Sequence, residues 1–147
     1  AWLAWQPPLD ILSDSHEWGL WLSFGVSRQD FDFATSRIVP ADSVLAVAEA
    51  TGWPKGTAAR AVLRFAKADC RPTPEQMRLI ATTGMEYSIP GRAGVDATVA
   101  DVSRLGIAVD RTDLGVMFAL VGNRATVVAM VKGGAREAAD VLGRQEW

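Results

Sequence analysis

The segment from Val47 to Lys67 constrains the fold of this chain more than any other, because two helix-like patterns flank a strong interruption. The interruption is Thr51-Gly52-Trp53-Pro54, which combines glycine and proline, the two residue types that most often end helices. After it, apolar side chains recur at the spacing of one helix face, and basic side chains recur on the opposite face. The segment therefore predicts two short helices joined by a tight turn, which is the outline of a helix-turn-helix.

The second of these helices has one apolar face and one cationic face. Pro54 suits its first turn, where a missing N–H costs nothing, and Thr57 offers a capping hydroxyl nearby. In a DNA-binding helix-turn-helix the polar face enters the major groove, where arginine can pair with guanine edges or phosphates. The apolar face, which we expect to pack on the first helix, comprises Ala58, Ala61, Val62 and Phe65. The predicted DNA-binding residues are Lys55, Thr57, Ala59, Arg60, Leu63, Arg64 and Lys67.

The same segment carries a family resemblance through Ala48, Glu49, Thr51, Gly52, Pro54, Lys55, Thr57, Ala58, Arg60 and Leu63. In this order these residues resemble the helix-turn-helix motif of IclR-type transcriptional regulators. The sequence departs from that motif at Trp53, where a smaller aliphatic residue is expected, and at Gly56, which replaces the usual serine. The resemblance covers residues 47–67 and implies a regulator that binds paired DNA half-sites as a dimer. The alternative is an ordinary pair of packed helices whose basic face is solvated.

The overall charge favours specific over non-specific nucleic-acid binding. The chain has 147 residues, a net charge of −2 and a pI of about 5.4, which argues against a protein dedicated to non-specific binding. Between residues 41 and 68, however, four cations stand against two anions. A specific binder can concentrate its positive charge locally in this way.

We expect one compact, soluble, cytoplasmic domain that makes no membrane contact. A hydrophobic share of 49% and a charged share of 22% are ordinary for a globular domain. Residues 1–12 lack the basic start and long apolar core of a signal peptide. The apolar run Leu114–Asn123 is too short to span a bilayer. The single cysteine, Cys70, excludes an internal disulfide.

The N-terminal region predicts a β-hairpin. Large side chains alternate with small ones from Trp18 to Val26, and this period of two is typical of a strand that buries Trp18, Leu20, Leu22 and Phe24. The polar residues Ser27–Asp30 can then turn the chain into a second strand, Phe31–Val39. The Trp-rich region is best explained as a core anchor.

A three-helix unit follows. Asp42 or Ser43 can cap its first helix, and the helix-turn-helix segment supplies the first and second helices. Thr73-Pro74-Glu75-Gln76 has the residues of a capping box, so we predict a third helix that runs to about Thr83 and stops at Gly84.

Beyond this unit we predict mixed α/β structure. Met85–Pro90 suggests a short strand, and a helix is expected from Asp96 to about Leu105. Gly115–Val121 and Ala125–Lys132 are apolar on nearly every residue, and the Gly122-Asn123 pair between them is typical of a hairpin turn. A last helix is expected over Ala135–Leu142.

Catalytic chemistry has little support. Ser13-Asp14-Ser15-His16-Glu17 combines a hydroxyl, an imidazole and carboxylates, but a metal site needs further ligands and His16 is the only histidine. A polar loop is the simpler interpretation. We therefore predict no catalytic residues, no metal and no cofactor, and we keep a small hydrolase using His16 only as a third hypothesis.

Taken together, the sequence predicts a single α+β domain over residues 1–147. A β-hairpin region (1–40) and an α/β region with a hairpin (85–147) flank the three-helix unit (41–84). The predicted function is sequence-specific DNA binding by a transcriptional regulator that self-associates through the C-terminal hairpin. The alternative is a non-catalytic protein-interaction or assembly domain, such as a secretion, phage or immunity component, in which the helix pair is only structural.

Overall fold

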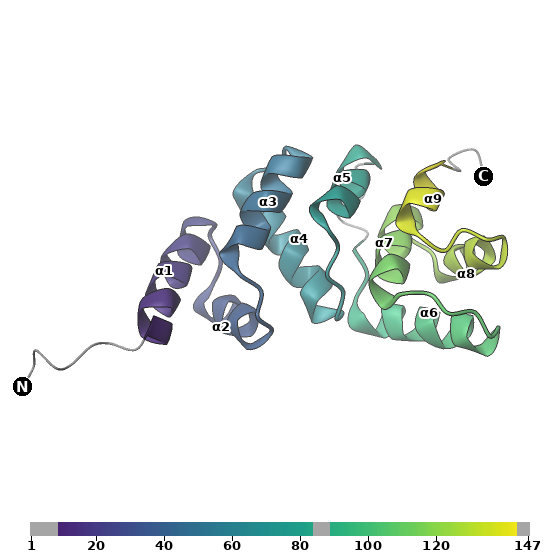
Figure 1. Ribbon diagram of the computed structural model, residues 1–147, viewed down its shortest axis with the longest axis horizontal. Helices are drawn as coiled ribbons and strands as arrows, with labels where there is room; N and C mark the ends of the chain where they lie inside the picture. The colour runs from purple at the N-terminus through teal and green to yellow at the C-terminus, as the bar shows by residue number, and fades with distance from the viewer. Residues whose placement is uncertain (1–8, 84–88, 144–147) are drawn as a thin grey trace, which may run out of the picture.

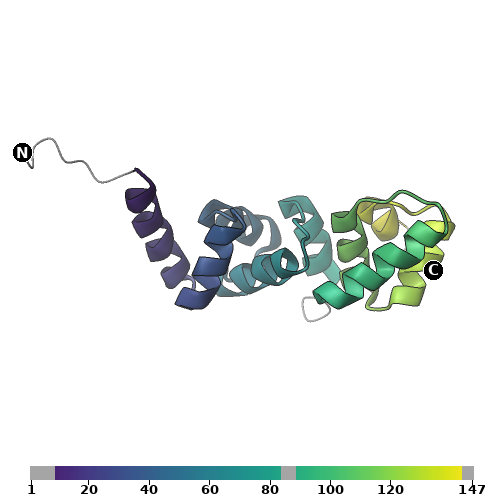
Figure 2. The ribbon, with the colours of Figure 1, turned by 90° about the horizontal axis from the view of Figure 1, so that it is seen from below.

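The computed structural model describes residues 9–83 and 89–143 of the chain. Within these ranges it contains nine α-helices and no β-strand. The helices succeed one another along the long axis of an elongated molecule, with α1 at one end and α8 and α9 at the other (Figures 1 and 2). Their bounds are α1 Leu9–Ser23, α2 Arg28–Ser36, α3 Ala41–Thr51, α4 Lys55–Lys67, α5 Pro74–Thr83, α6 Arg92–Arg104, α7 Arg111–Val121, α8 Arg124–Lys132 and α9 Ala138–Gly143.

The prediction of an α+β fold is therefore wrong, beginning with the N-terminal hairpin. Most of Trp18–Val26 belongs to α1, in which Trp21 is 1% exposed whereas Leu22 is 56% exposed. The side chains that face the core follow the helical i, i+3 spacing of Trp18 and Trp21. The alternation of large and small residues ran over too few positions to distinguish a strand from a helix.

The second predicted strand, Phe31–Val39, is also wrong, because most of it lies in α2. The polar residues before it are the start of this helix, and no hairpin turn forms there. Ser27 is the N-cap of α2, and its hydroxyl accepts a hydrogen bond from the backbone N–H of Asp30 at 3.1 Å. A serine followed three residues later by an acidic residue is a known start signal for helices, and this signal competes with the interpretation as a turn.

The C-terminal hairpin is wrong for a related reason. Gly115–Val121 lies in α7 and Ala125–Lys132 in α8. Gly122 has φ +68°, the left-handed conformation of a helix C-cap, and Asn123 caps α8 by accepting from the N–H of Thr126 at 3.0 Å. The Gly-Asn pair thus ends one helix and starts the next. The predicted strand Met85–Pro90 lies mostly outside the described residues, and its last two, Ile89 and Pro90, are not in a strand.

The helices of the central unit are confirmed. The third one, α5, begins with the predicted capping box: the N–H of Gln76 donates to the Thr73 hydroxyl, and the N–H of Thr73 donates to the Gln76 side chain. The first one, α3, is capped differently, because neither Asp42 nor Ser43 is its N-cap. Pro40 holds that position without a side-chain hydrogen bond, and the carboxylate of Glu17 in α1 accepts from the N–H of Ala41 at 2.8 Å.

Among the other predicted helices, α6 begins at Arg92 rather than Asp96, and α9 at Ala138 rather than Ala135.

Two apolar clusters form the interior. The larger one unites α1–α5 with parts of α6, α7 and α9, and the smaller one lies among α6, α7, α8 and α9. Val99 and Leu120 pack against both clusters, so the two are continuous. A hydrogen bond of 2.7 Å from the Gln76 amide to the Asp113 carboxylate also joins α5 to α7. The N-terminal half of the chain is thus held to the C-terminal half by packing and by polar contacts.

No single helix among the described residues is long and apolar enough to cross a membrane. Of the helices that the structure describes, only α7 and α8 taken together are long and apolar enough, and this pair is bent by 120° at the intervening Gly122-Asn123. Their apolar side chains are largely buried inside the protein, where they form much of the smaller apolar cluster.

Candidate nucleic-acid interface

The turn between α3 and α4 is built by Gly52, Trp53 and Pro54, as the sequence predicts. Gly52 has φ +77° and donates from its N–H to the carbonyl of Ala48, which ends α3. The hydroxyl of Thr51 then accepts from the N–H of Trp53 at 3.1 Å. The indole of Trp53 packs partly against the larger core cluster. These contacts fix where α4 begins.

Helix α4 is buried on most of its circumference. Its buried side chains are Ala58, Ala59, Ala61, Leu63, Phe65 and Ala66, and most of them are small, so that neighbouring helices can approach closely. The predicted burial of Ala58, Ala61 and Phe65 is confirmed, while Val62 is only partly buried. The predicted exposure of Ala59 and Leu63 to a DNA groove is wrong, because these side chains are 0% and 3% exposed. One apolar face was expected, but core residues cover α4 from two sides.

The cationic residues of α4 are all exposed. Lys55 lies at its first position, and Arg60, Arg64 and Lys67 follow on the strip that remains outside the core. Thr57 is partly buried and accepts a hydrogen bond from the Arg60 guanidinium at 3.4 Å. The guanidinium of Arg64 donates to the carbonyl of Ile89 at 3.2 Å. The helix therefore presents a row of positive charge, and local contacts orient two of its members.

Arg60, Arg64 and Lys67 meet in an open hollow of about 360 Å³. One wall is α4 itself, and the other consists of residues 24–27, which connect α1 to α2, together with Asp30 of α2. We call this space the cationic hollow. The ammonium of Lys67 forms an ion pair with Asp30 at 3.2 Å and lies 5.7 Å from the centre of the Phe33 ring. Neither arginine forms an ion pair with a carboxylate among the described residues.

The connection between α1 and α2 approaches α4 closely at Gly56. A Cβ atom at this position would lie 3.1 Å from the carbonyl oxygen of Phe24, a distance that side chains rarely tolerate. The Cβ atom of a serine, the usual residue at this position of the IclR-type motif, would be in tight contact with this carbonyl. Close packing therefore explains why this chain has glycine at position 56. The connection between α1 and α2 thus covers Gly56 in the first turn of α4, and the exposed cations of α4 lie beside this contact.

Sequence reasoning missed the residues that line the far wall of the cationic hollow. Asp30 of α2 and Ser27, the N-cap of this helix, contribute to it, whereas the sequence was interpreted as a hairpin turn there. The capping pattern could have identified the helix. Nothing in the sequence indicates that this helix end lies beside α4, because the two segments are more than 30 residues apart and no charge pattern links them.

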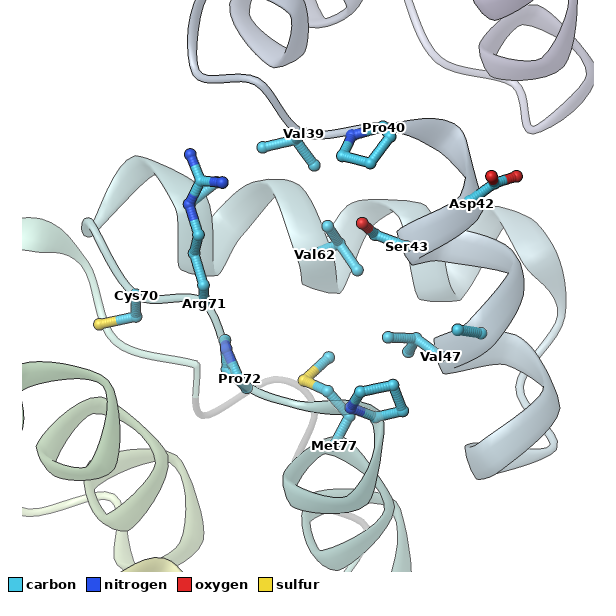
Figure 3. Close-up of a pocket in the computed structure, with 13 residues that line it drawn as sticks. Val39, Pro40, Asp42, Ser43, Val47, Val62, Cys70, Arg71, Pro72 and Met77 are labelled. Atoms are coloured by element: carbon cyan, nitrogen blue, oxygen red, sulfur yellow. The ribbon is translucent and has the colours of Figure 1, made fainter.

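A second hollow, of about 350 Å³, lies between α3, α4 and α5. Val39, Val62 and Met77 converge on it, while the thiol of Cys70 points away toward α7 (Figure 3). Its remaining lining is Pro40, Asp42, Ser43, Ala46, Val47, Ala66, Arg71, Pro72 and Pro74. Most of these side chains are apolar, so the hollow suits an apolar group better than an ion.

The enzyme-like segment Ser13–Glu17 is part of α1, so its interpretation as a polar loop is wrong. His16 is exposed. Glu17 has a structural position: besides capping α3, its carboxylate accepts from the indole of Trp21 at 3.3 Å. No group of three or more potential metal ligands occurs among the residues that the structure describes.

Cys70 is buried under α7. A Cβ atom at Gly115 would lie only 2.6 Å from its Sγ, so any residue larger than glycine at this position of α7 would force the thiol or the helix to shift. Burial raises the pKa of the thiol from 9.0 to about 11, although the nearby Arg111 acts in the opposite direction. A protonated, enclosed thiol is a poor nucleophile, so Cys70 contributes to the packing under α7.

No protein-family model, curated protein or solved structure matches this chain. The resemblance to IclR-type regulators thus stays a prediction that rests on residues 47–67. The functional argument depends on the geometry of the cationic hollow.

Proposed function

We propose that the protein binds DNA through the cationic strip of α4. The observation that supports this most is the gathering of Arg60, Arg64 and Lys67 on one exposed helix face, in a chain whose net charge is −2. Some cations elsewhere, such as Arg28, Arg92 and Arg124, are matched by carboxylates, whereas Arg71 donates to a backbone carbonyl and Arg37 lies over the Phe33 ring. Arg60 and Arg64 keep most of their five N–H donors available. Unmatched guanidinium groups are what a polyanion such as DNA requires.

The proposal includes the role of a transcriptional regulator that reads sequence with the same helix. Arginine can bond the O6 and N7 atoms of guanine with two parallel hydrogen bonds, and such a pair discriminates between bases. The resembling family implies a dimer on paired half-sites; no described surface tests self-association, which stays a prediction. A cytoplasmic location and the absence of a catalytic role are parts of the same proposal.

Replacement of the arginines tests the proposal. We expect Arg60→Ala and Arg64→Ala each to weaken binding to a fluorescent duplex by about 1–3 kcal/mol, the usual range for one lost arginine contact. The matched control is Arg104→Ala. Arg104 is also exposed and, like Arg64, lies in the last turn of its helix, but this helix is α6 (Figure 1), and Arg104 is paired with Asp101. Equal affinities of all three variants and the wild type would disprove a role of α4 in DNA binding.

A second candidate, a protein-interaction domain, is favoured by the apolar hollow between α3, α4 and α5. Hollows of this size and composition accept a large apolar side chain of a partner. We expect an amphipathic peptide with such an anchor to bind the wild type and not Val62→Gln, which places a neutral polar group in the hollow. DNA affinity should be the same in both proteins, so that the two candidate functions can be separated.

A further inference from the structure

We propose that the cationic hollow is a binding site for a phosphate group and that Asp30 limits its strength by holding Lys67. This inference rests on the proposed DNA-binding function and assigns the contact to the sugar-phosphate backbone. The ligand class is a phosphate oxyanion, which can be supplied by a DNA phosphodiester or by a free phosphate compound.

The charge of the hollow is the first argument. Its lining contains three cations and, among the described residues, one carboxylate, so it carries a net charge of +2. Arg60 and Arg64 lie on adjacent turns of α4, and the Thr57 hydroxyl and the Ile89 carbonyl each hold one of their guanidinium groups. A guanidinium whose orientation is already fixed loses less conformational freedom when it binds an oxyanion.

The shape of the hollow is the second argument. Residues 24–27 form a wall that stands against the first turn of α4, as the 3.1 Å approach at Gly56 shows. In a helix-turn-helix the N-terminal residues of the recognition helix are the ones that reach base edges. Here residues 24–27 stand against Gly56 in that first turn, while Lys55 before it is exposed and Arg64 and Lys67 lie further along the helix. Phosphates, which protrude from the duplex, can enter such a hollow more easily than base edges.

The ion pair of Asp30 with Lys67 is the third argument. The Asp30 carboxylate lies 3.2 Å from the Lys67 ammonium group and pairs with it, so this ammonium is not fully available to a phosphate. Both side chains are substantially exposed, at 53% for Lys67 and 38% for Asp30, so the pair is weak enough to exchange. A bound phosphate therefore competes with Asp30 for Lys67, and removal of the carboxylate charge should strengthen binding.

The test is a gain of affinity in Asp30→Asn. This replacement removes the charge but keeps the size of the side chain, and the N–H of residue 30 can still bond to Ser27. We expect duplex binding to become about fivefold tighter, the size of one released surface ion pair. The slope of log K against log salt concentration should steepen by about 0.9, which corresponds to one additional phosphate contact.

The matched control is Asp32→Asn. Asp32 lies on the same helix and is paired with Arg28 at 3.3 Å, but it does not line the cationic hollow. The Asp32→Asn variant should bind the duplex with nearly the affinity of the wild type and with nearly the same dependence of log K on log salt concentration. If the two variants behave alike, general charge and not the hollow determines binding, and the inference is overturned while the DNA-binding function stands. The same conclusion follows if Asp30→Asn binds DNA no more tightly than the wild type.

A titration with inorganic pyrophosphate separates failure of the site from failure of the function. The Nε–H signals of Arg60 and Arg64 in NMR spectra should shift on addition of pyrophosphate, and the dissociation constant should be lower in Asp30→Asn than in Asp32→Asn. If these shifts occur but no duplex binds, the phosphate site stands and the proposed DNA-binding function fails. If neither pyrophosphate nor duplex shifts these signals, both proposals fail.

Discussion

The approach of α7 to Cys70 makes a specific prediction about Gly115. Replacing a glycine inside a helix by alanine normally stabilises a protein by about 1 kcal/mol. At Gly115 the new Cβ would lie 2.6 Å from Sγ of Cys70. Carbon atoms in good contact are about 3.5–4.0 Å apart, so roughly 1 Å of overlap must be relieved. Overpacking of this kind costs about 1–3 kcal/mol, and we therefore expect Gly115→Ala to destabilise the protein by up to about 2 kcal/mol.

Urea unfolding of four proteins measures this effect: the wild type, Gly115→Ala, Cys70→Ala and the double variant. Removing Sγ leaves the Cβ of residue 70 at 3.5 Å from the new methyl group, so the overlap largely disappears. In the Cys70→Ala background, Gly115→Ala should then be neutral or stabilising. The coupling free energy between the two positions should be about 1–3 kcal/mol in favour of the double variant.

Gly19→Ala in α1 is the matched control, because its added methyl group would meet no atom within 4 Å. It should show the full gain of about 0.5–1 kcal/mol. If Gly115→Ala stabilised the protein as much as Gly19→Ala does, α7 could not pack against Cys70 as described. A coupling free energy near zero would lead to the same conclusion.

Three further predictions concern stability. Phe65→Ala should lower the free energy of unfolding by about 3–5 kcal/mol, because this side chain is fully buried in α4; a loss below about 1 kcal/mol in urea unfolding would contradict its core position. Glu17→Ala should cost about 1–2 kcal/mol by uncapping α3, while Glu49→Ala, on the exposed side of α3, should change stability by less than about 0.5 kcal/mol. Because folding raises the pKa of Cys70 from 9.0 to about 11, the thiol stabilises the fold below pH 9 and this contribution declines as the pH rises toward 11. Unfolding free energies of wild type and Cys70→Ala should therefore converge or cross in that interval, and parallel pH curves would show that the shift is absent.

The sequence predicts the central helices well because their signals are local. The glycine that ends α3 and the capping box that starts α5 act on residues within one turn, so no tertiary information is needed. The same local signals were present at Ser27 and at Gly122-Asn123, but there the hairpin interpretation was preferred. Apolar runs of seven or eight residues do not distinguish a buried strand from a buried helix, and α7 and α8 are examples of this ambiguity.

The candidate site could be predicted only in part. The exposure of Arg60, Arg64 and Lys67 follows from the periodicity of α4, which the sequence contains. The burial of Ala59 and Leu63 depends on a second packing surface around α4, and the wall formed by residues 24–27 depends on where α1 and α2 lie. Both are consequences of contacts between distant segments, for which a single sequence gives no direct signal.

The affinity of the wild-type protein for duplex DNA at two salt concentrations tests the central proposal most directly. Fluorescence anisotropy with a pool of random duplexes of about 30 base pairs is sufficient, since phosphate contacts do not depend on sequence. We predict binding at about 50 mM salt that weakens by roughly 0.9 log units in K per log unit of salt for each phosphate contact, and therefore clearly at about 200 mM. The absence of any binding at about 50 mM salt, where such contacts are strongest, would contradict the proposal that α4 binds DNA.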